Sequence, residues 1–168
     1  MILLSDPSEE EPREDSPPLK VRDVMVKEVI SLDENSTVRE AVDIMNEFQI
    51  GSLIVLSRGK TVGIVTERDF LKRVIAGEKD AKTTKLKEIM TTPLVVVEPN
   101  MDLGEAVKLM FQKKIKKLVV VDANKLVGLV TLTDIARFQP EMIEMLKQLT
   151  TKQTVPKSMQ KVIDFYIV

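Results

Sequence analysis

The stretch VGIVTERD at residues 62–69 returns as VGLVTLTD at residues 127–134, and this duplication decides how the rest of the chain is interpreted. Extended outward, residues 25–72 align with residues 90–137 without a gap, at a constant offset of 65 residues. Identical pairs include Met45 with Met110 and Asp69 with Asp134. Self-similarity at a fixed offset is typical of an internal repeat, so the sequence contains two copies of one structural unit.

Each copy predicts the same order of elements: strand, helix, strand, strand, helix. The first helix begins with the spacing of a capping box, Thr37 with Glu40 in one copy and Asp102 with Glu105 in the other. Short apolar runs rich in Val predict the strands. They lie at residues 29–32, 53–56 and 62–65 in the first copy, and at 94–97, 118–121 and 126–130 in the second.

One such unit is too small to cover its own sheet. A three-stranded sheet with helices on one face leaves apolar surface that the second copy can bury. The predicted fold class is therefore α/β (α+β), with two β-α-β-β-α repeats packed as a pseudo-two-fold pair.

The ends of the chain differ from the repeats. Residues 5–18 are rich in Glu, Asp and Pro, a composition that favours a disordered acidic tail. After Pro140, apolar residues at helical spacing predict two helical segments. The expected organisation is a tail at 1–18, repeat 1 at 19–76, an exposed polar connector at 77–87, repeat 2 at 88–138 and a helical extension at 139–168.

Composition excludes several classes of function. Cys, His and Trp are absent, so disulfides, zinc sites with thiolate or imidazole ligands and histidine-based triads are excluded. The net charge of -1 argues against a general attraction to nucleic acid. No base, nucleophile and metal-ligand set converges, so we expect no enzyme. No secretory leader or membrane-spanning run is present, so a cytoplasmic location is expected.

The chemistry lies in the turn between the last strand and the last helix, GIVTERD (63–69) and GLVTLTD (128–134). A glycine permits close approach, a threonine hydroxyl and helix amides suit a phosphate, and an aspartate can accept two ribose hydroxyls. The alternative is a plain capping box, which a single copy of Thr-x-x-Asp favours. Its occurrence twice, after the same glycine, favours a ligand role.

These residues resemble a known family, the tandem cystathionine-β-synthase-type (CBS) domain pair, also called a Bateman module. The resemblance covers residues 19–138 and includes EAVKLM (105–110), KLVVVD (117–122) and both glycine-to-aspartate turns. It implies a stand-alone regulatory module with two clefts that require no cofactor. The implied ligand is AMP, ADP or ATP, alone or with Mg²⁺, with S-adenosylmethionine or NAD as alternatives. It also implies a homodimer and an unidentified partner protein that the module regulates.

The resemblance also implies that each cleft combines residues of both repeats. One cleft is expected to contain Thr66, Arg68, Asp69, Thr92, Pro93, Leu94, Ile115, Lys116 and Lys117. The other is expected to contain Lys27, Val29, Ile50, Gly51, Ser52, Thr131, Thr133 and Asp134.

In the first cleft, Asp69 is expected to hold the ribose, and Thr66 and Arg68 the phosphate. Leu94 and Ile115 would sandwich the adenine. The second cleft departs from the family's pattern, because Glu28 replaces a proline and Leu132 and Thr133 stand where the first copy has Glu67 and Arg68. The Asp69 cleft therefore ranks first. The competing hypothesis is a structural dimerisation module whose clefts bind no physiological ligand.

Overall fold

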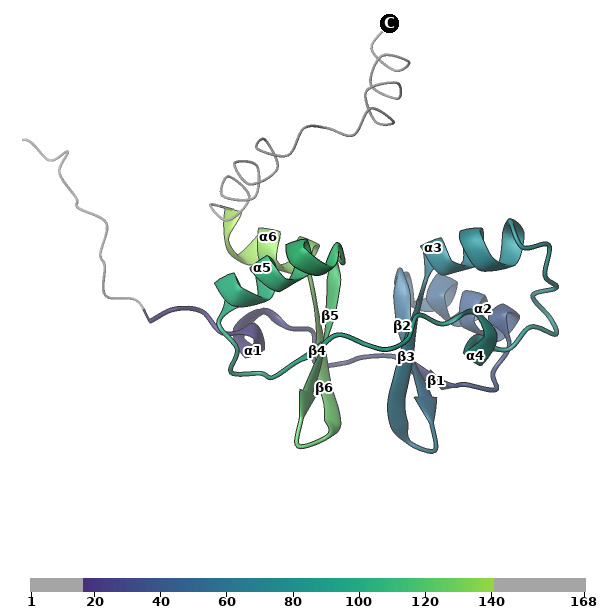
Figure 1. The fold of residues 1–168 in the computed structure, drawn as a ribbon, viewed down its shortest axis with the longest axis horizontal. Coiled ribbons are helices and arrows are strands. Elements are labelled where there is room, and N and C mark those ends of the chain that lie inside the picture. Colours follow the sequence, from purple (N-terminus) through teal and green to yellow (C-terminus); the bar gives the residue numbers. More distant parts are fainter. Residues whose placement is uncertain (1–16, 141–168) are drawn as a thin grey trace, which may run out of the picture.

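The computed structural model describes residues 17–140. The predicted acidic tail, up to residue 16, and the predicted helical extension, from residue 141, lie outside the described residues. Between them the chain forms two lobes whose sheets face each other at the centre, with the helices on the outer sides (Figure 1).

The two repeats have equivalent elements in the same order, and α3 with η1 in the first repeat corresponds to α6 in the second. The first has α1 (Val21–Val24), β1 (Ser31–Asp33), α2 (Val38–Phe48), β2 (Ser52–Ser57), β3 (Lys60–Thr66), α3 (Glu67–Asp69) and η1 (Phe70–Ile75). The second has α4 (Leu86–Ile89), β4 (Val96–Val97), α5 (Leu103–Lys113), β5 (Lys117–Asp122), β6 (Lys125–Thr131) and α6 (Leu132–Phe138). The predicted fold class, two β-α-β-β-α units forming a pair, is confirmed.

The two sheets have identical topology. In each, the first strand pairs parallel with the second, and the second pairs antiparallel with the third. The register shifts once per sheet, after Val55 in β2 and after Val120 in β5, which are equivalent positions. The repeat offset in the sequence is thus reproduced down to single irregularities of the backbone.

Local sequence explains where the long helices begin and end. Thr37 forms the predicted capping box with Glu40 at the start of α2, and Asp102 caps α5 by accepting a hydrogen bond from the Gly104 amide over 2.9 Å. At their other ends, the equivalent residues Gln49 and Lys114 both take the left-handed conformation. Both helices bury an apolar stripe against their own sheet.

The segments before the two sheets are exchanged between the lobes. Helix α4 precedes the second sheet in sequence, yet Leu86 and Ile89 are buried in the core of the first lobe. Helix α1 precedes the first sheet, yet Val21 and Val24 are buried in the core of the second. Backbone hydrogen bonds fix both, for example from the Leu86 amide to the Ser36 carbonyl and from the Val21 amide to the Met101 carbonyl.

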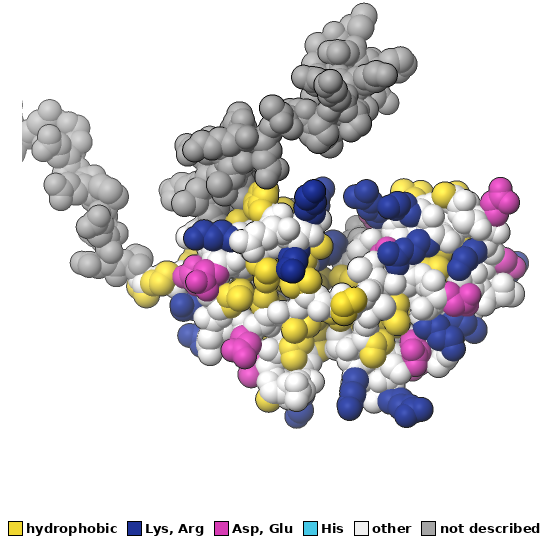
Figure 2. Space-filling view, in the orientation of Figure 1, with side chains coloured by type: hydrophobic (Ala, Val, Ile, Leu, Met, Phe, Trp, Pro, Cys, Tyr) yellow, Lys and Arg dark blue, Asp and Glu magenta, His cyan; other side chains and the backbone are white. Residues whose placement is uncertain are grey.

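This exchange corrects the expectation of an exposed connector. Thr84 is only 7% exposed and Leu86 is fully buried, because the end of residues 77–87 completes the first core. Apolar side chains also gather where the two lobes meet, and Lys and Arg side chains lie around the edge of the same face (Figure 2). The two lobes therefore form one structure with shared segments.

Candidate functional site

Both Thr-x-x-Asp turns are formed, and both are capping boxes. In the first, the Thr66 amide and hydroxyl donate to Asp69 Oδ2 over 2.9 and 3.0 Å. In the second, the Thr131 amide and hydroxyl donate to Asp134 Oδ2 over 3.1 and 2.7 Å. In each turn one carboxylate oxygen thus accepts hydrogen bonds at the start of a short helix. The other oxygen is the one available to further partners.

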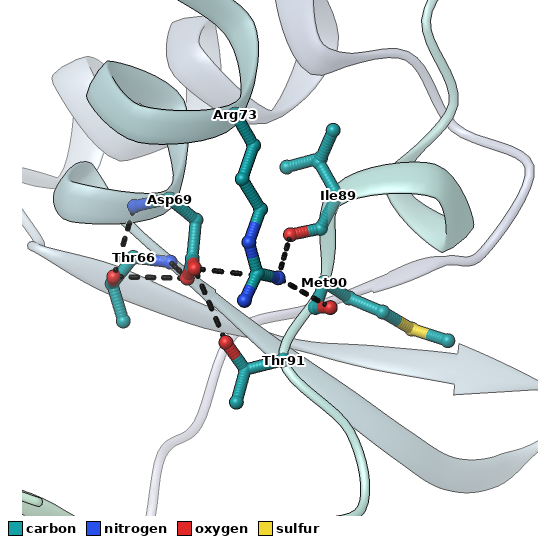
Figure 3. A network of polar contacts seen from close by, with 6 residues as sticks. All are labelled: Thr66, Asp69, Arg73, Ile89, Met90 and Thr91. Carbon is teal, nitrogen blue, oxygen red and sulfur yellow. Dashed lines mark hydrogen bonds and ion pairs between the residues drawn. The ribbon is translucent and has the colours of Figure 1, made fainter. Parts of the chain in front are cut away.

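The other oxygen of Asp69 is held by the segment that leads into the second repeat (Figure 3). The Thr91 hydroxyl donates to Asp69 Oδ1 over 3.1 Å, and Arg73 Nη1 lies 3.5 Å from the same oxygen. Arg73 also donates to the carbonyl oxygens of Ile89 and Met90 over 2.6 and 2.7 Å. We call Thr66, Asp69, Arg73 and Thr91 the Asp69 network; it connects the two repeats, and Asp69 is only 7% exposed.

The equivalent positions around Asp134 carry different chemistry. Phe138 stands where the first repeat has Arg73, and Val26 stands where the second has Thr91. Neither side chain can donate a hydrogen bond. Within residues 17–140, Asp134 Oδ1 has no hydrogen-bond partner, and Asp134 is half-buried.

The leading segment of each repeat lies along the last strand of the other. Thr91 exchanges two backbone hydrogen bonds with Ile64 of β3, and Val26 exchanges two with Leu129 of β6. Thr92, Pro93 and Leu94 come directly after Thr91, which is paired with the strand that ends at the Asp69 turn. Lys27 and Val29 come soon after Val26, which is paired with the strand that ends at the Asp134 turn. Their place in the two clefts stays a prediction.

The centre of the pair is asymmetric. Lys117 Nζ donates to Ser52 Oγ over 3.1 Å, and these two residues occupy equivalent positions in the repeats. Burial lowers the pKa of Lys117 below the usual lysine value, and the nearby Glu67 and Asp134 carboxylates oppose that shift. Lys117 was expected in the Asp69 cleft. It contacts Ser52, which was expected in the other cleft, and the carboxylates that act on its pKa come from both turns, Glu67 from the first and Asp134 from the second.

The remaining predicted residues lie around these turns. Ile115 is half-buried, whereas Arg68, Lys116 and Thr133 are exposed. Ile50 and Gly51 line an open depression of about 700 Å³ made only of residues of the first repeat. Its lining consists of Val42, Met45, Asn46, Gln49, Ile50, Gly51, Glu67, Phe70 and Leu71.

Sequence reasoning missed Arg73 and Thr91. It searched for residues that the two copies share, and these two are positions at which the copies differ. The usable signal was the difference itself, because Arg73 aligns with Phe138 and Thr91 with Val26, close to the glycine, threonine and aspartate that both turns share.

We expect Lys117→Met to raise the melting temperature near neutral pH by about 1–3 °C. In the wild type, the lowered pKa of Lys117 means that the folded state accommodates the ammonium group less favourably than the unfolded chain does. As the pH rises through the folded-state pKa, the unfolded chain binds more protons than the folded one, so the wild type gains stability. The advantage of the variant should then shrink.

Thermal unfolding at neutral and alkaline pH measures this difference. Lys116→Met, at the exposed neighbouring position, is the control and should show no such dependence on pH. An advantage for Lys117→Met that grows with pH would contradict the assignment.

Two classes of feature are not found within residues 17–140. No three acidic side chains gather in an arrangement that could hold a metal ion. None of the helices there combines the length and the apolar character needed to cross a bilayer.

Comparison with known proteins agrees with the repeat structure. The family model described as CBS domain matches residues 21–76 and again residues 86–141. The CBS domain-containing protein YhcV of Bacillus subtilis is 39% identical over 116 residues, which are 69% of this chain and 82% of that protein.

Solved structures have the same fold. An uncharacterized conserved protein from Pyrococcus horikoshii has a TM-score of 0.67 and 31% identity, covering 71% of this chain and 90% of that one. The CBS domain pair of protein MJ0100, solved in complex with 5′-methylthioadenosine and S-adenosyl-L-methionine, has a TM-score of 0.66 and 29% identity, covering 73% and 96%. The chain therefore belongs to the CBS domain family and contains two CBS domains in tandem.

Proposed function

We propose that this CBS pair is a regulatory module that binds an adenosine-containing ligand between its repeats and transmits its occupancy to a partner protein. The observation that carries the proposal is the pair of equivalent aspartates, each beginning a helix beside the leading segment of the other repeat. A carboxylate in such a place can accept the hydroxyls of a ribose. The related pair of MJ0100, in complex with two adenosine compounds, supports the same ligand class.

Charge favours a phosphate-bearing ligand, and we propose AMP, ADP or ATP. Lys117 supplies an ammonium group at the centre of the pair, and Arg68 is an exposed cation in the first turn. A cation near the ribose site stabilises the negative charge of a phosphate. S-adenosylmethionine carries a positive sulfonium instead, and NAD carries two phosphates, so the comparison of these ligands is informative.

A thermal-shift series with AMP, ADP, ATP, S-adenosylmethionine and NADH tests the proposal. A ligand that binds only the folded state, at 100 times its dissociation constant, adds about 2.7 kcal/mol of stability, which corresponds to a shift of roughly 5–10 °C. GMP and inorganic phosphate are the controls, because they contain the phosphate without the adenine. Equal shifts with AMP and GMP would contradict adenine recognition.

The second candidate is a structural dimerisation module, and exposed apolar side chains on the first repeat favour it. Leu71 and Ile75, one turn apart on η1, are 64% and 70% exposed, and Phe48 at the end of α2 is 56% exposed. Burial of such side chains against a second copy would stabilise a homodimer. A chain that is dimeric by light scattering, but that no adenosine compound stabilises, would support this candidate over the first.

A further inference from the structure

The two aspartates differ in how much of their hydrogen-bonding capacity the protein already uses. An ionised carboxylate has about four acceptor positions. At Asp69 these positions face the Thr66 amide, the Thr66 hydroxyl, the Thr91 hydroxyl and the Arg73 guanidinium. At Asp134 the partners among residues 17–140 are the Thr131 amide and hydroxyl alone, both on Oδ2.

A ribose brings two hydroxyl donors on neighbouring carbons, so it needs two unused acceptor positions on the carboxylate. Among residues 17–140, Asp134 Oδ1 has no hydrogen-bond partner, so both of its acceptor positions are unused. At Asp69 a ribose would have to displace the Thr91 hydroxyl and Arg73 from Oδ1. Arg73 is further held by the carbonyl oxygens of Ile89 and Met90, so its displacement would disturb the segment that leads into the second repeat.

Lys117 supplies an ammonium group to the second turn as well as to the first. It extends from β5 to Ser52, and the carboxylates of Glu67, in the first turn, and Asp134, in the second, both act on its charge. The first turn contains Arg68, but Arg68 is exposed and makes no hydrogen bond among the described residues.

We infer that the chain takes one adenosine ligand, through Asp134, and that the Asp69 network instead joins the two repeats and keeps the first cleft closed to a ribose. This inference rests on the proposed function and reverses the order of the clefts that the sequence suggested. It makes Asp134 the specificity-determining residue for the ribose hydroxyls and makes Arg73 and Thr91 positioning residues.

Isothermal titration of the full chain with adenosine and with 2′-deoxyadenosine tests the inference. For the wild type we expect one site per chain and about tenfold weaker binding of 2′-deoxyadenosine. Asp134→Ala should weaken adenosine binding at least 100-fold. Asp69→Ala should leave the affinity within about threefold while lowering the melting temperature, because it removes the carboxylate that Arg73 and Thr91 share.

A second variant keeps the test valid if Asp69→Ala fails to fold. The double substitution Arg73→Phe with Thr91→Val gives the first turn the side chains that the chain has at the equivalent positions of the second turn, namely Phe138 and Val26. It should free Asp69 Oδ1 and raise the number of adenosine sites from one to two per chain. A merely structural role for Arg73 and Thr91 predicts lower stability with the number of sites unchanged.

The outcomes separate the two levels of the proposal. Two equal sites in the wild type, or loss of binding in Asp69→Ala with binding retained in Asp134→Ala, would overturn this inference and leave the proposed function standing. A wild type and a double variant that both fail to bind any adenosine compound would overturn the proposed function, and this inference with it.

Discussion

Leu86→Ala is expected to lower the free energy of unfolding by about 2–5 kcal/mol, the range for truncating a fully buried leucine. Leu86 is fully buried in the core of the first lobe, although it precedes the second sheet in sequence. Its removal should therefore leave a cavity between α4 and the first sheet. Urea denaturation followed by circular dichroism measures the loss.

Leu71→Ala is the matched control, because it makes the same chemical change at a position that is 64% exposed. We expect it to change the stability by about 0.5 kcal/mol or less. If Leu86→Ala proved as mild as Leu71→Ala, the exchange of the leading segments between the lobes would be wrong.

Gly128→Ala is expected to cost about 1–3 kcal/mol, because the two repeats approach each other too closely there for a side chain. A Cβ at Gly128 would lie 3.0 Å from the backbone oxygen of Val26 and 2.7 Å from Met25 Sδ. The sulfur can move aside, but Val26 is fixed by its two backbone hydrogen bonds with Leu129. Thermal unfolding of the variant measures the cost.

Gly104→Ala is the control for this substitution. Gly104 lies at the start of α5, and the equivalent residue of α2 is Arg39. A Cβ at Gly104 would lie 3.1 Å from Asp102 Oδ1 and within 4 Å of no backbone atom outside its own helix and chain neighbours, so a small shift of that side chain accommodates it. Alanine also favours helix more than glycine does, so stability should be unchanged or should rise. A Gly128→Ala variant as stable as Gly104→Ala would contradict the close packing of Val26 on β6.

The repeat and its elements could be predicted from sequence because their signals are local. The constant offset, the capping box of Thr37 with Glu40 and the apolar runs of the strands each depend on neighbouring residues. The exchange of α1 and α4 is a long-range property. A short segment such as Leu86–Ile89 has two apolar residues on one face, and nothing in that pattern states which of two similar sheets it covers.

The candidate site was predictable to the same extent. Each Thr-x-x-Asp turn was found by its pattern, and both capping boxes are formed. The partners of the second carboxylate oxygen were not found, because Arg73 reaches Asp69 from the following turn and Thr91 reaches it from 22 residues away. The assignment of the site residues to a ligand stays a prediction that the titrations above can test.

Because α1 and α4 are exchanged between the lobes, each core is completed by a helix that the other repeat supplies. A polypeptide with one unit alone would lack the helix that closes its core, and it could obtain that helix only from a second molecule, at a stability that depends on dilution. Joining two units through residues 77–87 makes the donor part of the same molecule, so its effective concentration is set by the tether. Completion of each core is then independent of how much protein the cell makes.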